Sequence, residues 1–360
     1  MSRSFPPKGR GALSQPDPRY LETVRESVDD GWPEGVEPAP PLRTTLTWEH
    51  PRAIINTNRS PDIPFEQSIN PYRGCEHGCI YCYARPAHAY VDLSPGLDFE
   101  SRLFAKAGAA ARLREQLAAP AYRCSPIALG GNTDAYQPLE RRLRVTREIL
   151  EVLAETKHPV TIVTKSALVE RDLDLLAPMA KRGLVQVYLS VTTLDAGLAR
   201  RMEPRAAAPR RRLKTIQTLS EAGVPTGVMF APVIPAINDH EMEAVLAAAA
   251  EHGAVYAGYV LLRLPREVEP LFCEWLENHF PLRAPRVLSL LRDLRAGKTS
   301  DAAFGTRLTG TGALAQLIKA RFQRASREQG LNRSDHRLIT QLFEPPKLGP
   351  QLDLFAQAQD

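Results

Sequence analysis

Three cysteines lie within eight residues of this 360-residue chain, at Cys75, Cys79 and Cys82. Their spacings of four and three residues allow the three thiols to hold three corners of one cube-shaped [4Fe–4S] cluster. Such clusters are normally held by four thiolates, so a set of three leaves one iron without a cysteine and free to bind another molecule. The sequence therefore predicts an iron–sulfur site with an open coordination position.

An aromatic residue, Tyr83, follows the third cysteine directly. The segment from Asn70-Pro-Tyr-Arg-Gly-Cys75 to Tyr83-Ala-Arg85 resembles the radical S-adenosylmethionine (radical SAM) superfamily. The resemblance implies that the amine and carboxylate of S-adenosylmethionine chelate the open iron, with Tyr83 in the cofactor site. It also implies an electron donor, whose electron splits the sulfonium and yields a 5′-deoxyadenosyl radical that abstracts a hydrogen atom. In this chemistry the protein binds and orients its cofactors.

Two other uses of these cysteines compete with this interpretation. A zinc site would use the same thiols with His77, but zinc sites more often combine a Cys-x2-Cys pair with a second, distant pair. Disulfides are disfavoured because the chain shows no signal peptide and no apolar run near eighteen residues, and because it has only five cysteines. This pattern is typical of a reduced, cytoplasmic protein without a membrane partner. Buried, inert thiols are the simplest interpretation of Cys124 and Cys273.

Composition divides the chain into four parts. Hydrophobic residues make up 43% of the sequence, which suffices for one large core. Residues 1–60 are proline-rich without sustained periodicity, and we expect an arm that wraps the core or stays mobile. We assign 61–300 to a catalytic core, 301–345 to a basic helical extension and 346–360 to a flexible tail.

Short apolar runs alternate with helical patterns, such as 139–156, between the cysteines and residue 265. The predicted strands are Gln67–Tyr72, Pro126–Gly130, Val160–Thr164, Val185–Ser190, Thr226–Phe230 and Val255–Leu262. Repeated βα units predict an α/β protein whose parallel sheet is buried on both faces. Six units fit the partial (β/α)6 barrel of TIM type that the resemblance implies, although periodicity alone also allows an open, doubly wound sheet.

Polar residues follow successive predicted strands, where the chemistry of such a barrel lies. Those after the second strand are Gly130, Gly131, Asn132, Thr133 and Asp134. This loop takes the place of the glycine-rich segment that contacts the methionyl amine in radical SAM enzymes. Lys165 after the third strand and Ser190 at the end of the fourth could bind the carboxylate and ribose, and residues 232–239 could pack on adenine. Helix capping is the commoner role of each polar residue alone, but their recurrence favours a cofactor site.

Residues 61–300 resemble one branch of the superfamily, that of spore photoproduct lyase, which reverses a thymine dimer in DNA. The shared motifs are Asn132-Thr-Asp-Ala-Tyr-Gln-Pro-Leu-Glu140, Thr164-Lys-Ser166, Ser190-Val-Thr-Thr-Leu-Asp195 and Arg201-Met-Glu-Pro204. The lyase returns a hydrogen atom from a cysteine just before the polar loop. This chain has Gly130-Gly131 there and Cys124 comes several residues too early, so the same relay is not expected. Tyrosines are alternative donors, although packing is the commoner role of each: Tyr136, Tyr188, Tyr256 and Tyr259.

The chain ends with Gln351-Leu-Asp-Leu-Phe355 and five further residues. This pentapeptide is similar to the one by which bacterial polymerases and repair proteins bind the DNA sliding clamp. Its contacts would come from Gln351, Leu352, Leu354 and Phe355. Apolar side chains on a tail beyond a proline-rich linker have no core of their own to enter. A tail that folds back on its own domain, or a chance match, is the alternative.

Two segments are rich in basic residues. Residues 200–214 hold seven of them against one acid, Glu203, and residues 285–330 hold nine more. The second segment includes a glycine- and threonine-rich turn, 304–312, that suits phosphate oxygens. A solvated helix face is the alternative for both, and Ile318 with Phe322 gives the second a stripe that faces the core. We expect nucleic acid as the partner.

The sequence thus predicts a radical SAM enzyme, a lyase or transferase, that acts on nucleic acid, with damaged or modified DNA favoured. One alternative keeps the cofactors and moves the substrate to tRNA or a protein side chain. Absence of clamp binding together with copurified RNA would favour it. Another is a non-enzymatic iron–sulfur or zinc module that recruits a partner and binds no S-adenosylmethionine.

Overall fold

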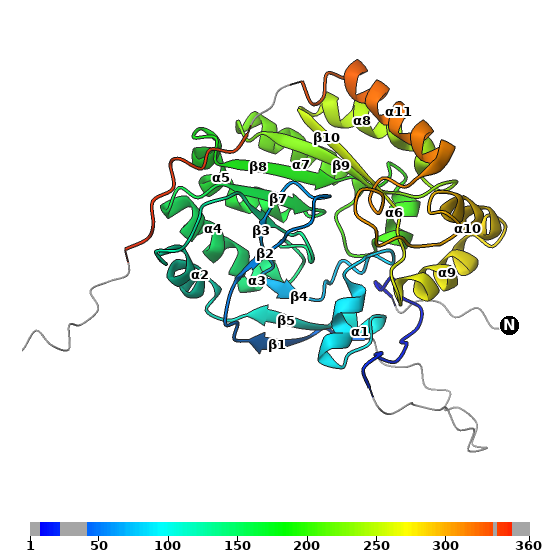
Figure 1. Cartoon of the computed structure of the whole chain (residues 1–360), viewed down its shortest axis with the longest axis horizontal. Coiled ribbons are helices and arrows are strands. Elements are labelled where there is room, and N and C mark those ends of the chain that lie inside the picture. The colour runs from blue at the N-terminus through cyan, green and yellow to red at the C-terminus, as the bar shows by residue number, and fades with distance from the viewer. Residues whose placement is uncertain (1–7, 22–41, 334–336, 348–360) are drawn as a thin grey trace, which may run out of the picture.

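The structure is a computed structural model that describes residues 8–21, 42–333 and 337–347. A seven-stranded sheet lies at its centre (Figure 1). Its order is β10-β9-β8-β7-β6-β3-β2. Neighbours from β3 to β10 are parallel, and β2 is antiparallel to β3 at one edge. The strands are β2 (Ile55–Thr57), β3 (Gln67–Ile69), β6 (Ile127–Leu129), β7 (Val160–Thr164), β8 (Val185–Ser190), β9 (Thr226–Val233) and β10 (Tyr256–Leu261).

Helices connect the parallel strands and pack on the outside of the curved sheet (Figure 1). These connections are α3 (Glu140–Leu143), α4 (Val145–Glu155), η2 (Ala167–Asp172), α5 (Leu173–Ala180), α6 (Ala196–Met202), α7 (Pro209–Glu221), η3 (Asp239–Glu241) and α8 (Met242–Glu251). The main core, rich in valine, leucine and isoleucine, lies between these layers. The six parallel strands confirm the partial (β/α)6 barrel.

Two predicted elements are divided in the structure. The first predicted strand, Gln67–Tyr72, becomes β3 and a separate strand, β4 (Tyr72–Arg73), which pairs in another sheet. The predicted helix over 139–156 is interrupted at Arg144, whose φ of 60° ends α3 and begins α4. A left-handed residue cannot continue a right-handed helix, so the apolar periodicity passes through a turn.

A small sheet lies beside the barrel, with the order β1-β5-β4. It consists of β1 (Thr45–Glu49), β4 and β5 (Arg102–Lys106), with β1 parallel and β4 antiparallel to β5. Two helices flank β5, α1 (Leu97–Ser101) and α2 (Ala109–Leu117), and the 3-10 helix η1 (Arg85–Val91) precedes them. Thus residues 42–60, within the predicted arm, contain β1 and β2.

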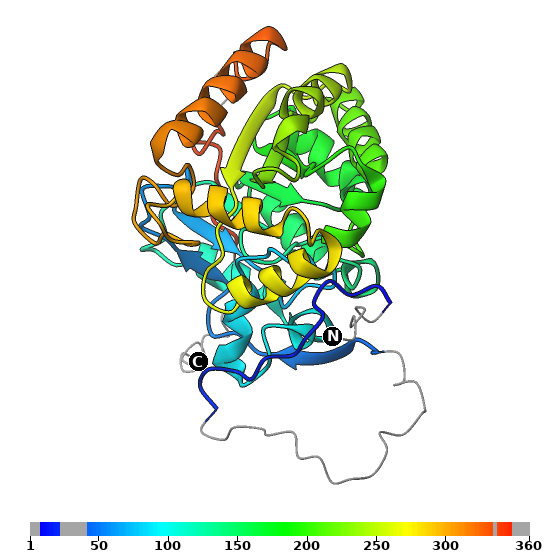
Figure 2. The same cartoon turned by 90° about the vertical axis from the view of Figure 1, so that its right-hand side faces the viewer.

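A second core covers the carboxyl ends of the strands, which we call the mouth of the barrel. It joins α9 (Val268–His279) and α10 (Ala284–Asp293) to residues that follow β9 and β10, including Ile234 and Leu264. Ala12, from an N-terminal strap at residues 8–21, is buried in the same core. Figure 2 shows the two helices and the strap at this end of the sheet.

Contacts of one side chain, Asp62, bridge the open side of the partial barrel. Asp62, just before β3, accepts a hydrogen bond from the amide of Gly305 at 2.6 Å and pairs with Arg307 Nε at 2.5 Å. The loop that carries Gly305 and Arg307 follows α10 and lies beside β10, where the amide of Leu261 donates to the carbonyl of Leu308. The two edges of the sheet are therefore linked although β10 and β2 do not pair.

The last long helix, α11 (Gly312–Glu328), packs on α8. Ile318 is buried, and the ring of Phe322 lies 4.7 Å from that of Tyr259, so the predicted core-facing stripe is present. Arg321 pairs with Glu243 of α8 at 2.7 Å. Part of the basic character of this extension therefore serves to attach it to the barrel.

The final described segment, 337–347, crosses the amino ends of β7 and β8. The amide of Ile339 donates to the carbonyl of Gly183, and Phe343 packs on His158 with ring centroids 5.2 Å apart. His158 Nε2 lies 2.7 Å from the Tyr122 hydroxyl. This attachment is at the end of the sheet opposite the mouth. Within the described ranges, no helix combines the length and apolar character needed to cross a bilayer.

The buried histidines should make the fold sensitive to acid. Burial lowers the pKa of His158 to about 4, and the same cause lowers that of His88 to about 4, against roughly 6.5 in the unfolded chain. The unfolded chain therefore binds more protons between these values, and stability present above pH 6.5 is lost as the pH falls toward 4. We expect a loss of about 2 kcal/mol per histidine at pH 5, measured by denaturant unfolding.

A His158→Leu variant isolates one of these groups, because all other titrating residues are shared with the parent protein. Its stability should fall less between pH 7 and pH 5 than that of the parent. Equal slopes for the two proteins would contradict the assignment.

Candidate functional site

The three cysteines lie in one loop at the mouth, residues 74–83, which we call the cluster loop. All three are free thiols. The loop is made of tight turns: the amide of Gly78 donates to the carbonyl of Cys75 at 3.3 Å, and that of Cys82 to Cys79 at 3.2 Å. Gly78 has a φ of 66°, and a Cβ there would lie 2.7 Å from Glu100 Oε2, so both conformation and space require glycine.

Burial raises the pKa of all three thiols, to about 12 for Cys79. For Cys75, the charge of Asp134 and then those of Cys79 and Cys82 raise the pKa further. Cys82 packs against both of the buried clusters that contain Cys75 and Cys79. Metals bind the thiolate and replace the proton, which removes this penalty. Two buried thiols and one half-buried thiol, all free and in one loop, therefore fit an iron–sulfur cluster.

A buried ion pair holds the cluster loop from one side. Arg85 is fully buried and donates to the carbonyl of Cys79 at 2.9 Å and to Glu100 at 2.5 Å. Glu100 in turn accepts the amides of Gly11 and Ala12, both at 2.9 Å, so it joins the N-terminal strap to the same pair. A Cβ on Gly11 would lie 1.9 Å from the carbonyl oxygen of Gly78, so only glycine allows the strap to lie this close to the cluster loop.

Asp134, in the loop after β6, holds the cluster loop from a second side. Its Oδ2 lies 3.2 Å from His77 Nδ1 and accepts the amide of Lys165 at 2.7 Å, while Oδ1 accepts the Thr164 hydroxyl at 2.7 Å. Burial opposes ionisation, but His77 and the hydrogen bonds together lower the pKa of Asp134 to about 2. One carboxylate thus connects the cluster loop with the ends of β6 and β7.

The rest of the predicted strand-two loop is also tied to the cluster loop. Gly130 has a φ of 83°, and a Cβ there would meet the carbonyl oxygen of Val163 at 2.4 Å. The Tyr83 hydroxyl donates to the carbonyl of Gly131. The structure therefore brings the aromatic residue after the third cysteine onto the glycine pair.

Asn132 and Thr133 complete this loop. Their amides donate to Asn70 Oδ1 at 3.0 and 3.5 Å, and the buried Thr133 hydroxyl donates to the carbonyl of Tyr72 at 2.8 Å. Both contacts fix the loop to the chain just before the cysteines. The Thr133 side chain is thus engaged by the protein itself.

Lys165 and Ser190 meet at the ends of β7 and β8. Lys165 Nζ donates to Ser190 Oγ at 3.0 Å and lies 5.8 Å from the centre of the Tyr81 ring. Tyr81 stands between the second and third cysteines, so the lysine reaches over the cluster loop. An ammonium group at this position can bind the carboxylate of another molecule.

A buried network around Glu203 was not predicted as part of the site. Glu203 accepts hydrogen bonds from the Tyr81 hydroxyl and from Thr192, the latter at 2.6 Å, and pairs with the fully buried Arg212. Burial opposes ionisation, but the charges of Arg212 and Lys165 lower the pKa of Glu203 to about 2. In the sequence, only the motif Arg201-Met-Glu-Pro204 pointed to Glu203. The motif does not reveal that the Glu203 carboxylate accepts a hydrogen bond from Tyr81.

Three of the seven basic residues at 200–214 form ion pairs within the molecule. Besides Arg212, Arg211 pairs with Glu170 at 2.6 Å and Arg205 with Glu76 at 3.1 Å. Only the exposed remainder of this run, such as Arg200 and Arg210, resembles a solvated basic surface.

The tyrosines considered as hydrogen donors lie in packed positions. Tyr136 is fully buried and donates to Asp172 at 3.0 Å, Tyr188 packs on Tyr256, and Tyr259 packs on α11. After β9, Asn238 donates to the carbonyl of Thr192 at 2.7 Å and shapes the turn at 232–239.

Comparisons with known proteins identify the family of this chain. A model of the radical SAM superfamily matches residues 69–249, just over half of the chain. An uncharacterized protein of Mycobacterium tuberculosis is 34% identical over 277 residues, which cover 74% of this chain and 82% of the relative. An uncharacterized protein of Methanocaldococcus jannaschii is 28% identical over 190 residues, which cover 52% of this chain and 67% of the relative.

Among solved structures, spore photoproduct lyase complexed with dinucleoside spore photoproduct has a similar fold. The TM-score is 0.57 at 15% identity, and the match covers 84% of this chain and 86% of the lyase. Radical SAM proteins use a [4Fe–4S] cluster and S-adenosylmethionine, and a mutant of the same lyase is known with bound S-adenosylmethionine. The matched domain and the similarity over most of the chain together show that this protein belongs to the radical SAM superfamily.

Proposed function

We propose that this protein is a radical SAM enzyme of DNA repair, which cleaves S-adenosylmethionine reductively and acts on damaged or modified DNA. The observation that carries the proposal is the convergence of the three-cysteine loop with Asp134, Lys165 and Ser190 at one end of the barrel. When bound, the [4Fe–4S] cluster supplies the electron that converts S-adenosylmethionine to methionine and a 5′-deoxyadenosyl radical.

Each part of the site has a task in this proposal. Cys75, Cys79 and Cys82 hold the cluster. Lys165, placed by Asp134 and Ser190, binds the carboxylate of S-adenosylmethionine. The Gly130–Asn132 backbone, which lies beside Tyr83, would bind the methionyl amine, and the buried second core under α9 and α10 would exclude water.

Nucleic acid is supported as the substrate by the fold and by charge. The similar lyase structure holds a dinucleoside lesion, and exposed arginines remain on α11 and around 200–210. The cysteine relay of the lyase is not part of the proposal. Cys124 precedes β6 and so lies at the end of the strand opposite the mouth, while Gly130-Gly131 stands where the relay residue is expected.

The C-terminal tail supports DNA as the substrate independently. Gln351, Leu352, Leu354 and Phe355 lie outside the described residues. The segment that leads to them crosses the amino ends of β7 and β8, so the attachment point is opposite the mouth. A tail anchored there suits a tether to the sliding clamp, because clamp binding leaves the catalytic end free.

The central test is anaerobic reconstitution followed by analysis of damaged and undamaged DNA. The parent protein should form 5′-deoxyadenosine and change the damaged strand. Cys75→Ala, Cys79→Ala and Cys82→Ala should each abolish 5′-deoxyadenosine, because loss of one thiolate removes a cluster ligand. Cys124→Ala and Cys273→Ala are the matched controls and should retain iron and cleavage. Stoichiometric zinc after anaerobic purification, with no iron taken up on reconstitution, would refute the assignment.

Lys165→Ala should weaken S-adenosylmethionine binding by about 1.5–3 kcal/mol, the range for a lost hydrogen bond to a charged group. Binding is measured by equilibrium dialysis on reconstituted protein of equal iron content. Lys181→Ala, which removes an exposed lysine after α5, is the control and should bind as the parent does. An unchanged affinity of Lys165→Ala would show that another group binds the carboxylate.

A synthetic peptide of residues 346–360 should bind the bacterial sliding clamp with roughly micromolar affinity, since ordering a short tail offsets part of the gain from apolar burial. Leu354→Ala combined with Phe355→Ala should eliminate clamp binding by the whole protein and leave S-adenosylmethionine cleavage intact. Calorimetry at high concentration decides the point. No heat of binding from either the peptide or the protein would end the clamp proposal.

A further inference from the structure

Two exposed tyrosines lie together at the mouth end of the molecule. Tyr20 belongs to the N-terminal strap and Tyr90 to η1, and their side chains are 49% and 63% exposed. Their ring centroids are 5.3 Å apart with planes tilted by 31°. The guanidinium of Arg19 stacks on both rings, at 5.2 and 5.8 Å from the centroids. Large aromatic rings so exposed, and so ordered by a cation, form a surface suited to stacking.

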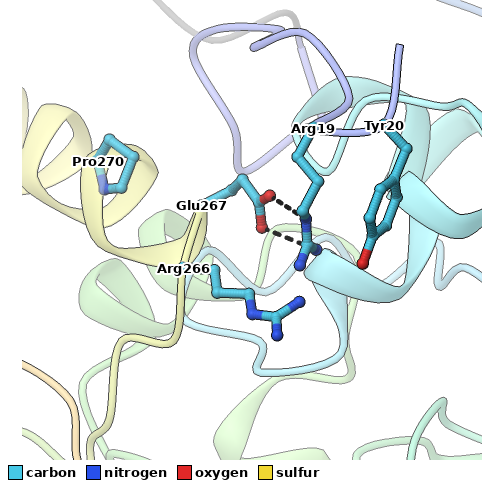
Figure 3. Close-up of a pocket in the computed structure, with 5 residues that line it drawn as sticks. All are labelled: Arg19, Tyr20, Arg266, Glu267 and Pro270. Carbon is cyan, nitrogen blue, oxygen red and sulfur yellow. Dashed lines mark hydrogen bonds and ion pairs between the residues drawn. The ribbon is translucent and has the colours of Figure 1, made fainter. Parts of the chain in front are cut away.

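Tyr20 also lines a shallow pocket of about 550 Å³, together with Arg19, Arg266, Glu267 and Pro270 (Figure 3). Glu267 pairs with Arg19 Nε at 2.7 Å and fixes the guanidinium beside the ring. Arg266 extends into the same space, is exposed, and makes no ion pair or side-chain hydrogen bond within the described part of the chain. Two guanidinium groups against one carboxylate leave the pocket positively charged.

The backbone of Arg266 also has an uncommon conformation. Its φ is 52°, a left-handed conformation that is uncommon for arginine. Such conformations cost free energy and occur preferentially where a side chain must be placed for a ligand. The outlier and the missing partner therefore point in the same direction.

The pocket, and Tyr90 beside it, belong to segments that lead to the cluster loop. The helix η1 that carries Tyr90 begins at Arg85, three residues after Cys82. The loop after β10 carries Arg263 over the ring of Tyr83, at 5.3 Å, and places Arg266 in the pocket three residues later. Short stretches of chain therefore join this surface to the cluster loop.

We propose that this pocket binds one unpaired nucleotide of the substrate DNA strand. The base stacks on the Tyr20–Tyr90 pair and Arg266 binds the adjoining phosphate. The inference rests on the proposed action on nucleic acid and specifies how the strand is held. An acidic peptide would use the cation but leave the flat aromatic face without a matching group. A base-paired nucleotide has its faces already stacked, so the platform selects single-stranded DNA.

The test measures binding of a single-stranded oligonucleotide that contains one 2-aminopurine. Fluorescence anisotropy reports binding, and quenching of the 2-aminopurine fluorescence reports stacking of that base. Tyr20→Ala and Tyr90→Ala should each weaken binding by about 5-fold to 100-fold and reduce the quenching. Tyr20→Phe and Tyr90→Phe keep the rings and should bind as the parent does. Arg266→Gln should reduce the slope of log K against log salt by about 0.7, the value for one phosphate contact to a single strand.

Matched controls remove an exposed aromatic or an exposed arginine elsewhere. They are Trp48→Ala on β1, where the side chain is 50% exposed, and Arg182→Gln, which removes an exposed arginine after α5. Both should keep the parent affinity and quenching. If the parent protein binds neither single-stranded nor duplex DNA, the proposed function fails and this inference with it. If the parent binds but the tyrosine-to-alanine variants bind equally well, only the pocket assignment is overturned.

Discussion

The buried carboxylate of Asp134 is the interaction on which the arrangement of the site depends. It contacts His77 of the cluster loop, the amide of Lys165 and the hydroxyl of Thr164, and so sets the distance between the cysteines and the ends of β6 and β7. A buried charge is stable only when it is fully paired and hydrogen-bonded, so these partners are fixed together. Asp134 accepts a hydrogen bond from the backbone amide of Lys165, so the ammonium group of this lysine can contact Ser190 instead. Direct contact of Asp134 with S-adenosylmethionine stays a prediction.

Two further carboxylates repeat this device. Glu100 pairs with buried Arg85 under the strap, and Glu203 pairs with buried Arg212 beside Tyr81. Together the three acids approach the cluster loop from the end of β6, from α1 and from the end of α6. A loop of tight turns has few internal hydrogen bonds and cannot hold three thiols in place alone. The carboxylates supply this support, which keeps the site preorganised before any cofactor binds.

The sequence predicted those features that depend on local pattern. The cysteine spacing and the apolar runs of β7 and β8 needed no knowledge of distant residues, and both strands begin and end as predicted. The small sheet was missed because β1 pairs with β5, more than fifty residues away, and its alternation is mostly exposed. Composition likewise showed a basic run at 200–214 but not its partners. Arg212 finds Glu203 through the fold, so a segment that looked like a phosphate surface is partly core.

The topology separates two tasks between the two ends of the barrel. Parallel strands put every carboxyl end at the mouth, where the cluster loop, the strap and the loop after β10 meet. The chain then returns over α11, and Ile339 and Phe343 attach its last described segment at the amino ends of β7 and β8. Under the proposed function, a sliding clamp bound to the tail would approach one end of the sheet while the substrate enters the other. Such a separation would let the tether raise the local concentration of the enzyme on DNA without competing for the site.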